Sequence, residues 1–176
     1  TGTYTTATSS KSTCLSCGAG QYQDTTGQQG CMDCPKGTAN AGTGQAFCGS
    51  CSQGKFSNTT GLQNCFDCPR GTAQSLTGAT ACVACSIGFE SPAVGAKECD
   101  RCSSGKYTRV TATVACTDCA PGSYQPLLNA STCLLCDPGT AQPSPGQAVC
   151  RVCACASSRV RFILTRYSRL SDVLGF

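Results

Sequence analysis

The sequence contains no His and no Trp, and it has few of the large apolar residues that build a protein core. Without an imidazole, the chain cannot assemble a Ser-His-Asp or Cys-His mechanism, nor most hydrolytic metal centres. Leu, Ile, Val and Phe supply 26 of the 176 residues, and eight of those 26 lie in the last 21 residues. Residues 1–155 therefore cannot form a conventional hydrophobic core. We predict that the chain is not an enzyme and that it holds no cofactor and no catalytic metal.

Charge is scarce as well, at 12% of the residues, and the net charge of +4 is unevenly spread. Residues 1–155 carry nine Lys and Arg against eight Asp and Glu, whereas residues 156–176 carry four Arg against one Asp. A neutral body argues against nucleic acid as a partner, because phosphate binding needs a concentrated basic surface. The longest run of large apolar residues, at 162–164, is far too short to span a bilayer.

Cysteine, in contrast, is abundant, with 19 residues in a strict pattern. Eighteen of them form nine Cys-x-x-Cys pairs with a 17-residue period, from Cys14 and Cys17 to Cys150 and Cys153, and Cys155 stands apart. A fixed period indicates a repeat array. If the first Cys of each pair is position zero, position six is Gly in the first eight units, and position thirteen is Gly in all of these but two, which have Ala112 and Asn129. Two glycines seven positions apart predict a short hairpin with a turn at each end.

The predicted fold class is therefore one of small disulfide-rich repeats, an extended tandem array of short β-hairpin modules with a 17-residue period and little conventional core. A looser period of 34 is superimposed at position eight, where ring-bearing and small residues alternate in the first four units as Tyr22, Ala39, Phe56 and Ala73. A small residue in one unit could receive the ring of its neighbour. A plain 17-residue repeat with exposed rings is equally consistent with this pattern.

Three chemistries use Cys-x-x-Cys pairs. Thioredoxin-type redox catalysis needs one such pair at a helix N-terminus in a βαβ unit, and this chain shows no βαβ pattern. The spacing Cys-x2-Cys-x13-Cys-x2-Cys comes close to a zinc site, but nine pairs would leave one pair without a partner. A cysteine-dense chain with little core is typical of a disulfide framework formed in an oxidising compartment. We therefore predict an extracellular or cell-surface location.

Sequence alone leaves the disulfide connectivity open. In the preferred scheme, the second Cys of each unit joins the first Cys of the next, so that every loop has the same length. That scheme gives Cys17–Cys31, Cys34–Cys48, Cys51–Cys65, Cys68–Cys82, Cys85–Cys99, Cys102–Cys116, Cys119–Cys133 and Cys136–Cys150. The alternative scheme uses the 34-residue period and gives Cys14–Cys31, Cys17–Cys34, Cys48–Cys65 and Cys51–Cys68. In both schemes contacts are local, so the array is quasi-one-dimensional.

Both ends of the chain differ from the repeats. Residues 1–13 resemble the back half of a preceding unit, so we expect residues 1–13 to be a partial repeat, residues 14–153 the array and residues 154–176 a basic, non-repeat tail. Within the tail, Val160, Ile163, Leu164 and Tyr167 recur at helical spacing, which favours an amphipathic helix able to lie on a membrane or a partner. A short strand, a disordered end and a wrong reading frame are the alternatives.

The repeat unit resembles the ephrin-receptor-like, growth-factor-receptor-type cysteine-rich repeat. The segments from Cys31 to Ala39 and from Cys65 to Thr72 match its pattern of Cys-x-x-Cys-x-x-Gly closely, and the pattern extends over residues 1–153. The unit is also similar to the first module of tumour-necrosis-factor-receptor cysteine-rich domains. The resemblance implies extracellular β-hairpin modules held by disulfides. It does not decide the function, because repeat modules of one fold serve many roles.

Two functions remain in view. An unbroken period suits lateral or end-to-end packing of equivalent surfaces, which favours a rod-like structural segment of an extracellular fibre or surface coat, such as a flagellar hair, sheath or cell-wall filament. The alternative is the stalk or ligand-binding region of a cell-surface receptor, with contact anchors at Tyr22, Phe56, Tyr107 and Tyr124. In that case too, the rings could simply pack over a disulfide of their own unit.

The expected partners follow from the fibre hypothesis. They are further copies of the chain or other fibre or coat subunits, together with covalent glycans. Two N-glycosylation sequons are present, Asn58-Thr59-Thr60 and Asn129-Ala130-Ser131, and both lie in loops that we predict to be exposed. Membrane contact is expected only through the tail at residues 156–176.

Overall fold

Antiparallel hairpins follow one another along the chain. The computed structural model describes residues 1–8 and 11–153. The first hairpin pairs β1 (Thr3–Thr8) with β2 (Lys11–Ser16), from Thr3 opposite Ser16 to Thr8 opposite Lys11. It precedes the first disulfide and is longer than the later hairpins. No helix occurs in the two ranges that the structure describes.

Eight short hairpins come next, each made of two strands of two residues. They are β3 (Gln21–Tyr22) with β4 (Met32–Asp33), β5 (Thr38–Ala39) with β6 (Gly49–Ser50), β7 (Lys55–Phe56) with β8 (Phe66–Asp67), β9 (Thr72–Ala73) with β10 (Val83–Ala84), β11 (Phe89–Glu90) with β12 (Asp100–Arg101), β13 (Lys106–Tyr107) with β14 (Thr117–Asp118), β15 (Ser123–Tyr124) with β16 (Leu134–Leu135), and β17 (Thr140–Ala141) with β18 (Arg151–Val152). In every hairpin, position seven lies opposite position two of the following unit, and position eight lies opposite position one.

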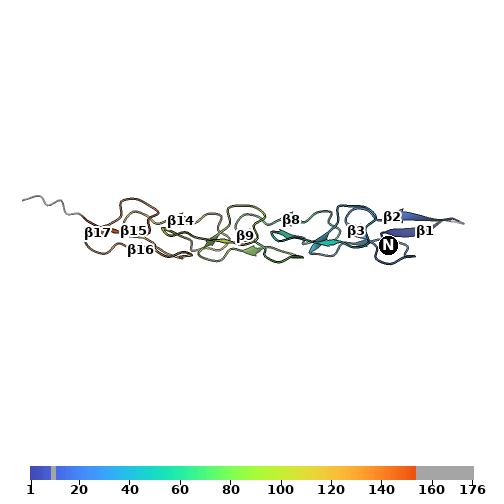
Figure 1. Cartoon of the computed structure of the whole chain (residues 1–176), viewed down its shortest axis with the longest axis horizontal. Helices are drawn as coiled ribbons and strands as arrows, with labels where there is room; N and C mark the ends of the chain where they lie inside the picture. Colours follow the sequence, from blue (N-terminus) through green and yellow to red (C-terminus); the bar gives the residue numbers. More distant parts are fainter. Residues whose placement is uncertain (9–10, 154–176) are drawn as a thin grey trace, which may run out of the picture.

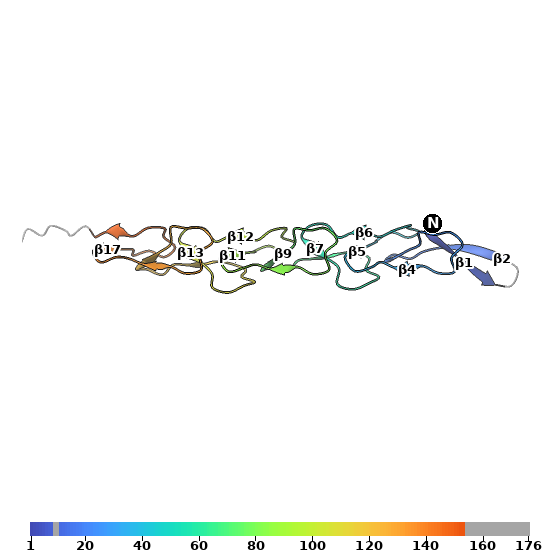
Figure 2. The same ribbon diagram turned by 90° about the horizontal axis from the view of Figure 1, so that it is seen from below.

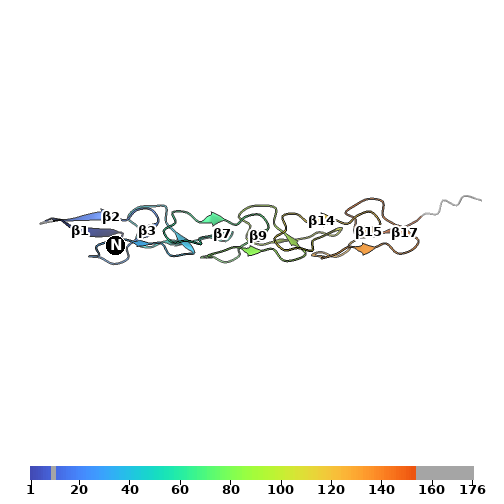
Figure 3. The same cartoon turned by 180° about the vertical axis from the view of Figure 1, so that it is seen from behind.

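The hairpins are strung along one axis to form a thin rod. Figure 1 shows β1 and β2 at one end of the rod and β17 at the other, in chain order. The same narrow outline appears from below in Figure 2 and from behind in Figure 3. The predicted fold class, an extended tandem array of disulfide-linked hairpins with a 17-residue period, is confirmed for the described residues.

The turns of each unit depend on left-handed backbone conformations. Positions six and thirteen have positive φ in all of the first eight units; in the unit that begins at Cys48, these are Gly54 at 78° and Gly61 at 73°. Ala112 and Asn129, which replace glycine at position thirteen, keep the same conformation, with φ of 57° and 48°. Asn tolerates this region, whereas Ala adopts it with strain of roughly 1–2 kcal/mol.

Successive disulfide loops are joined by three recurring backbone hydrogen bonds. Between the loop closed by Cys51 and the next loop, Gly54 N donates to Gln74 O (2.7 Å), Ser57 N donates to Ala79 O (3.0 Å), and Gly78 N donates to Cys51 O (2.7 Å). The same three bonds recur at all seven junctions between consecutive disulfide loops, at 2.7–3.3 Å. Each loop is therefore one layer of a stack, and the disulfide closes the layer without linking it to the next.

Contacts also reach the second loop along the chain. A Cβ placed on Gly54 would overlap the carbonyl group of Gly95, which belongs to the loop after next. The glycines at 20, 37, 71, 88 and 105 meet the equivalent carbonyls at positions 61, 78, 112, 129 and 146, in that order. In these six units, glycine at position six thus has two roles, because it permits the positive φ and leaves room for a carbonyl of a more distant layer.

The interior of the rod is made of sulfur and hydrogen-bonded polar side chains. The second Cys of each unit is fully buried from Cys17 to Cys119, at 0–1% exposure. In the first eight units, position nine is also shielded from solvent, and its residue is uncharged and polar. Gln23, Ser57, Gln74, Ser91, Thr108, Gln125 and Gln142 are buried, while Asn40 is half-buried. Of the described residues, none has a buried side-chain polar atom without a hydrogen-bond partner.

Candidate functional site

The disulfides lie at regular intervals along the rod. The structure contains Cys17–Cys31, Cys34–Cys48, Cys51–Cys65, Cys68–Cys82, Cys85–Cys99, Cys102–Cys116, Cys119–Cys133 and Cys136–Cys150, each with its Cα atoms 5.7 Å apart. These are the eight pairs of the preferred scheme. The pairs of the 34-residue scheme do not occur; for example, Cys17 and Cys34 belong to different bridges.

Three cysteines stand outside this pattern. Cys14 and Cys153 are exposed and have no partner among the described residues. Cys155 and the predicted amphipathic segment of the tail lie outside the described residues, as does the whole range 154–176. No group of three or more His, Cys, Asp and Glu able to hold a metal ion occurs in residues 1–8 and 11–153.

A glutamine at position nine forms hydrogen bonds to the backbone of its own loop. The sequence did not predict this role. Gln125 donates from Nε2 to Thr132 O (2.6 Å) and accepts from Leu127 N at Oε1 (3.0 Å). Gln74 and Gln142 make the same pair of bonds to residues seven and two positions further on. Ser and Thr at this position instead bond a carbonyl two positions further on, as Ser57 Oγ does to Thr59 O (3.0 Å). The available signal was that position nine is polar and uncharged in each of the first eight units.

Both sequons lie at the surface. Asn58 and the hydroxyl residue Thr60 are exposed, and so are Asn129 and Ser131. The backbone of Asn129 is held between layers, since its N–H donates to Cys102 O (2.9 Å). A glycan on either Asn side chain would therefore project from the rod without displacing a buried group.

The predicted anchor rings are half-buried rather than fully exposed. Tyr22, Phe56, Tyr107 and Tyr124 all have intermediate exposure. Phe56 packs within its own hairpin against Phe66, with ring centroids 5.9 Å apart and ring planes at 47°. The guanidinium of Arg109 lies over the ring of Tyr107, 5.4 Å from its centroid. Each of these two rings thus has a partner in its own neighbourhood.

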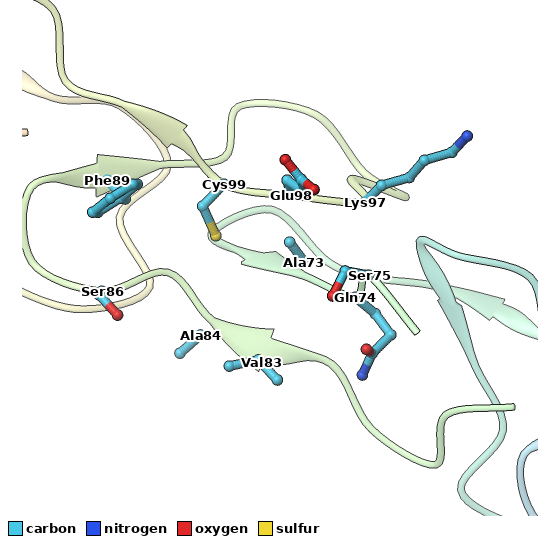
Figure 4. A pocket seen from close by; sticks show the side chains of 10 residues that line it. All are labelled: Ala73, Gln74, Ser75, Val83, Ala84, Ser86, Phe89, Lys97, Glu98 and Cys99. Atoms are coloured by element: carbon cyan, nitrogen blue, oxygen red, sulfur yellow. The ribbon is translucent and has the colours of Figure 1, made fainter. Parts of the chain in front are cut away.

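An open hollow of about 360 Å³ lies beside the hairpin of Ala73 and Val83. Figure 4 shows these two side chains together with Phe89, Lys97 and Glu98 of the following loop around the hollow. Position eight is Ala in this unit, so no ring fills the space from within the hairpin. A second hollow of about 380 Å³ lies beside Ala39 and Gly49. These two small-residue units thus leave open space beside their hairpins.

Cross-strand pairs add polar contacts on the surface of the hairpins. Lys106 Nζ lies 2.7 Å from Asp118 Oδ1, and Lys55 forms the equivalent ion pair with Asp67. The hydrogen bond to Asp118, and then the charge of its carboxylate, raise the pKa of Lys106 above its usual value. Both pairs are about half exposed, so they contribute little to stability.

The geometry agrees with a family comparison. The profile of the tyrosine-protein kinase ephrin type A/B receptor-like family matches residues 2–44, 71–115 and 105–150, well over half of the chain. The chain belongs to the ephrin-receptor-like family. No curated protein has a significant match to it.

Membership of the ephrin-receptor-like family bears on several of the expectations from sequence. The suspected resemblance to this type of cysteine-rich repeat is confirmed. Disulfide-rich receptor-like repeats indicate an extracellular structural or receptor-type region, and such repeats are typically non-catalytic. Over residues 1–8 and 11–153, the structure contains no helix with the length and apolar character needed to cross a membrane.

Proposed function

We propose that this chain is a rod-like, disulfide-stapled segment of an extracellular glycoprotein fibre or surface coat, of the flagellar-hair, sheath or cell-wall type. The observation that carries the proposal is the uniformity of the stack. All seven junctions between disulfide loops use the same three backbone hydrogen bonds, and no unit is interrupted by an insertion. Ligand-binding surfaces usually depend on irregular loops, whereas a uniform rod presents equivalent surfaces at a constant interval.

The mechanism of such a segment is mechanical. Each disulfide joins positions 14 residues apart, so the shortest covalent path along the rod passes through the bridge and the two residues of each Cys-x-x-Cys, not around the loop. Tension along the rod is therefore carried by short covalent segments, while hydrogen bonds between layers keep the rod straight. The chain supplies stiffness and spacing, and on this proposal it is not an enzyme.

Glycans belong to the same proposal. Asn58 and Asn129 would carry N-linked glycans, supported by the exposure of both sequons on an otherwise weakly charged rod. Enzymatic removal of N-glycans, followed by peptide mass analysis of the native protein, should convert Asn58 and Asn129 to Asp. Unmodified Asn at both sites in native material would contradict this part of the proposal.

A second candidate function is the stalk or ligand-binding region of a cell-surface receptor. It is favoured by the family, whose description refers to a receptor. Negative-stain imaging of native material separates the two candidates. Fibrous or coat-like assemblies that contain the chain support the fibre or coat. Isolated particles tethered to membranes would overturn it in favour of the receptor.

A further inference from the structure

The two hollows beside the rod are copies of one site. Most residues that line the hollow at Ala39 have a counterpart two units later around the hollow at Ala73. The matching pairs are Ala39 and Ala73, Gly49 and Val83, Ser50 and Ala84, Lys55 and Phe89, Gln63 and Lys97, and Cys65 and Cys99. Over this part of the rod the hollow therefore recurs at every second unit, in step with the small residue at position eight.

Ring-bearing hairpins repeat with the same interval. Tyr22 lies opposite Met32, and two units later Phe56 lies opposite Phe66. Met32 is 41% exposed and Phe66 is 50% exposed, so each of these hairpins presents apolar surface to the outside. A third such hairpin, Tyr124 opposite Leu134, follows after a further four units. The rod thus carries apolar projections and hollows with one common spacing.

A shift of one repeat brings the two series into register. Adding 17 to Tyr22 gives Ala39, and adding 17 to Phe56 gives Ala73, so both projections meet both hollows in the same alignment. In this alignment Phe66 of one rod faces Val83 of the other, and both side chains are at least half exposed. Because a cavity of roughly 150 Å³ accommodates benzene, a hollow of about 360 Å³ has room for the exposed part of a ring pair.

One further hairpin in the alignment brings an acidic side chain toward a cation. The hairpin of Glu90 and Asp100 replaces the ring-bearing hairpin in the middle of the series. Adding 17 places it opposite Tyr107, where no small residue stands but where Arg109 lies over the ring. Arg101 also belongs to this hairpin, and Glu90 Oε2 already accepts a hydrogen bond from Cys116 N of its own chain. Asp100 is exposed, and it is the acidic side chain that this alignment brings toward the cation at Tyr107.

We propose that the hollows at Ala39 and Ala73 bind a second copy of this chain, aligned parallel and staggered by one 17-residue repeat, with Tyr22–Met32 and Phe56–Phe66 of one rod seated in them. This inference rests on the proposed fibre or coat role and specifies its lateral contact. The contact is heterologous, because projections meet hollows, so each rod can bind a further rod and the association is open-ended.

Charge substitutions on the two exposed contact residues test the pairing. Phe66→Asp and Val83→Lys should each raise the concentration needed for association at least tenfold, measured by light scattering and sedimentation velocity. The double variant should return to within about threefold of the unsubstituted chain, because the carboxylate introduced at position 66 of one rod then faces the ammonium introduced at position 83 of the next. The matched control is Phe47→Asp, which changes an equally large and 74% exposed ring outside both series. Equal weakening by the control, or a double variant weaker than either single variant, would overturn the proposal.

A photo-crosslink reports the alignment directly. Benzoyl-phenylalanine at position 66, in a mixture of light and heavy isotope-labelled chains, should link to the hairpin of Ala73 and Val83 in another copy. Links to the hairpin of Ala39 and Gly49 instead would indicate an antiparallel pair or the opposite stagger, and either would overturn the proposed alignment. An absence of any intermolecular link at concentrations where the chain associates would overturn the lateral contact itself. In all these cases native fibres could still contain the chain, whereas the proposed function fails only if imaging of native material shows isolated, membrane-tethered particles.

Discussion

Replacing Gly54 by Ala should destabilise the rod far more than the same change at Gly27, although both glycines have a φ of 78°. Ala in this conformation costs roughly 1–2 kcal/mol at either position. At Gly27, no described atom lies within 4 Å of the new Cβ, so this strain is the whole effect. At Gly54, the new Cβ overlaps the carbonyl of Gly95 and must push the two layers apart.

The separation at Gly54 removes further interactions. The hydrogen bond from Gly54 N to Gln74 O and that from Gly95 N to Cys68 O both lie at this contact, and each contributes about 1 kcal/mol. We therefore expect the Gly54→Ala variant to lose about 2 kcal/mol more than Gly27→Ala. Urea unfolding with the disulfides intact measures the difference, and hydrogen exchange at the amide of Gly95 locates it. Equal losses, within about 0.5 kcal/mol, would refute the idea that layers two units apart are in contact.

Three other perturbations address the polar core, the bridges and the ion pairs. Gln125→Ala should cost about 1–3 kcal/mol, because it removes a buried amide that bonds Leu127 N–H and the Thr132 carbonyl; a urea midpoint equal to that of the unsubstituted chain would contradict this. Replacing Cys51 and Cys65 together by Ser opens a loop of about 15 residues and should lower local stability by roughly 3 kcal/mol. Hydrogen exchange should become faster in that loop and its neighbours rather than along the whole rod. The pKa of Lys106 is raised in the folded state, so its ion pair stabilises the fold at pH values below the unfolded pKa. This contribution is lost as the pH rises through the folded pKa. Asp118→Asn should return the pKa of Lys106, measured by NMR, to its usual value, and an unchanged pKa would contradict the pairing.

The repeat and its turns were predictable because they depend on residues with few alternatives. A 17-residue cysteine period and glycine at position six determine where the chain must turn, and positive φ at Gly54 and its equivalents confirms those turns. Asn129 was also identifiable, since Asn tolerates positive φ. Local chemistry at these positions leaves the backbone little choice, so the fold class followed from the sequence.

The contacts between layers could not be predicted in the same way. The hydrogen bonds at each junction join backbone groups, and backbone groups carry no sequence signal. The buried role of Gln125 was missed because a polar residue in a coreless chain is expected at the surface. The suggested packing of a ring into the neighbouring unit of the same chain also differs from what the structure shows at Phe56, whose ring contacts Phe66 of its own hairpin and leaves the hollow at Ala73 open.

The first hairpin shows how one extra residue changes a unit. Gly2 N donates to Gln23 O (2.6 Å), and in the next unit Gly20 N donates to Asn40 O (2.7 Å). The acceptor lies 21 positions after Gly2 but 20 positions after Gly20. The strands that follow Gly2 are six residues long rather than two. Residues 1–13 were expected to be part of a preceding repeat; among the described residues, Thr3–Thr8 pair with Lys11–Ser16, so the pairing extends past residue 13.

Non-reducing peptide mapping of the native protein tests the stapled stack most directly, because the stack requires each bridge to close its own loop. The expected result is eight linked peptide pairs with a separation of 14 residues, beginning with Cys17–Cys31 and ending with Cys136–Cys150. Bridges between equivalent cysteines of neighbouring units, such as Cys17–Cys34, or free thiols throughout the array, would contradict it.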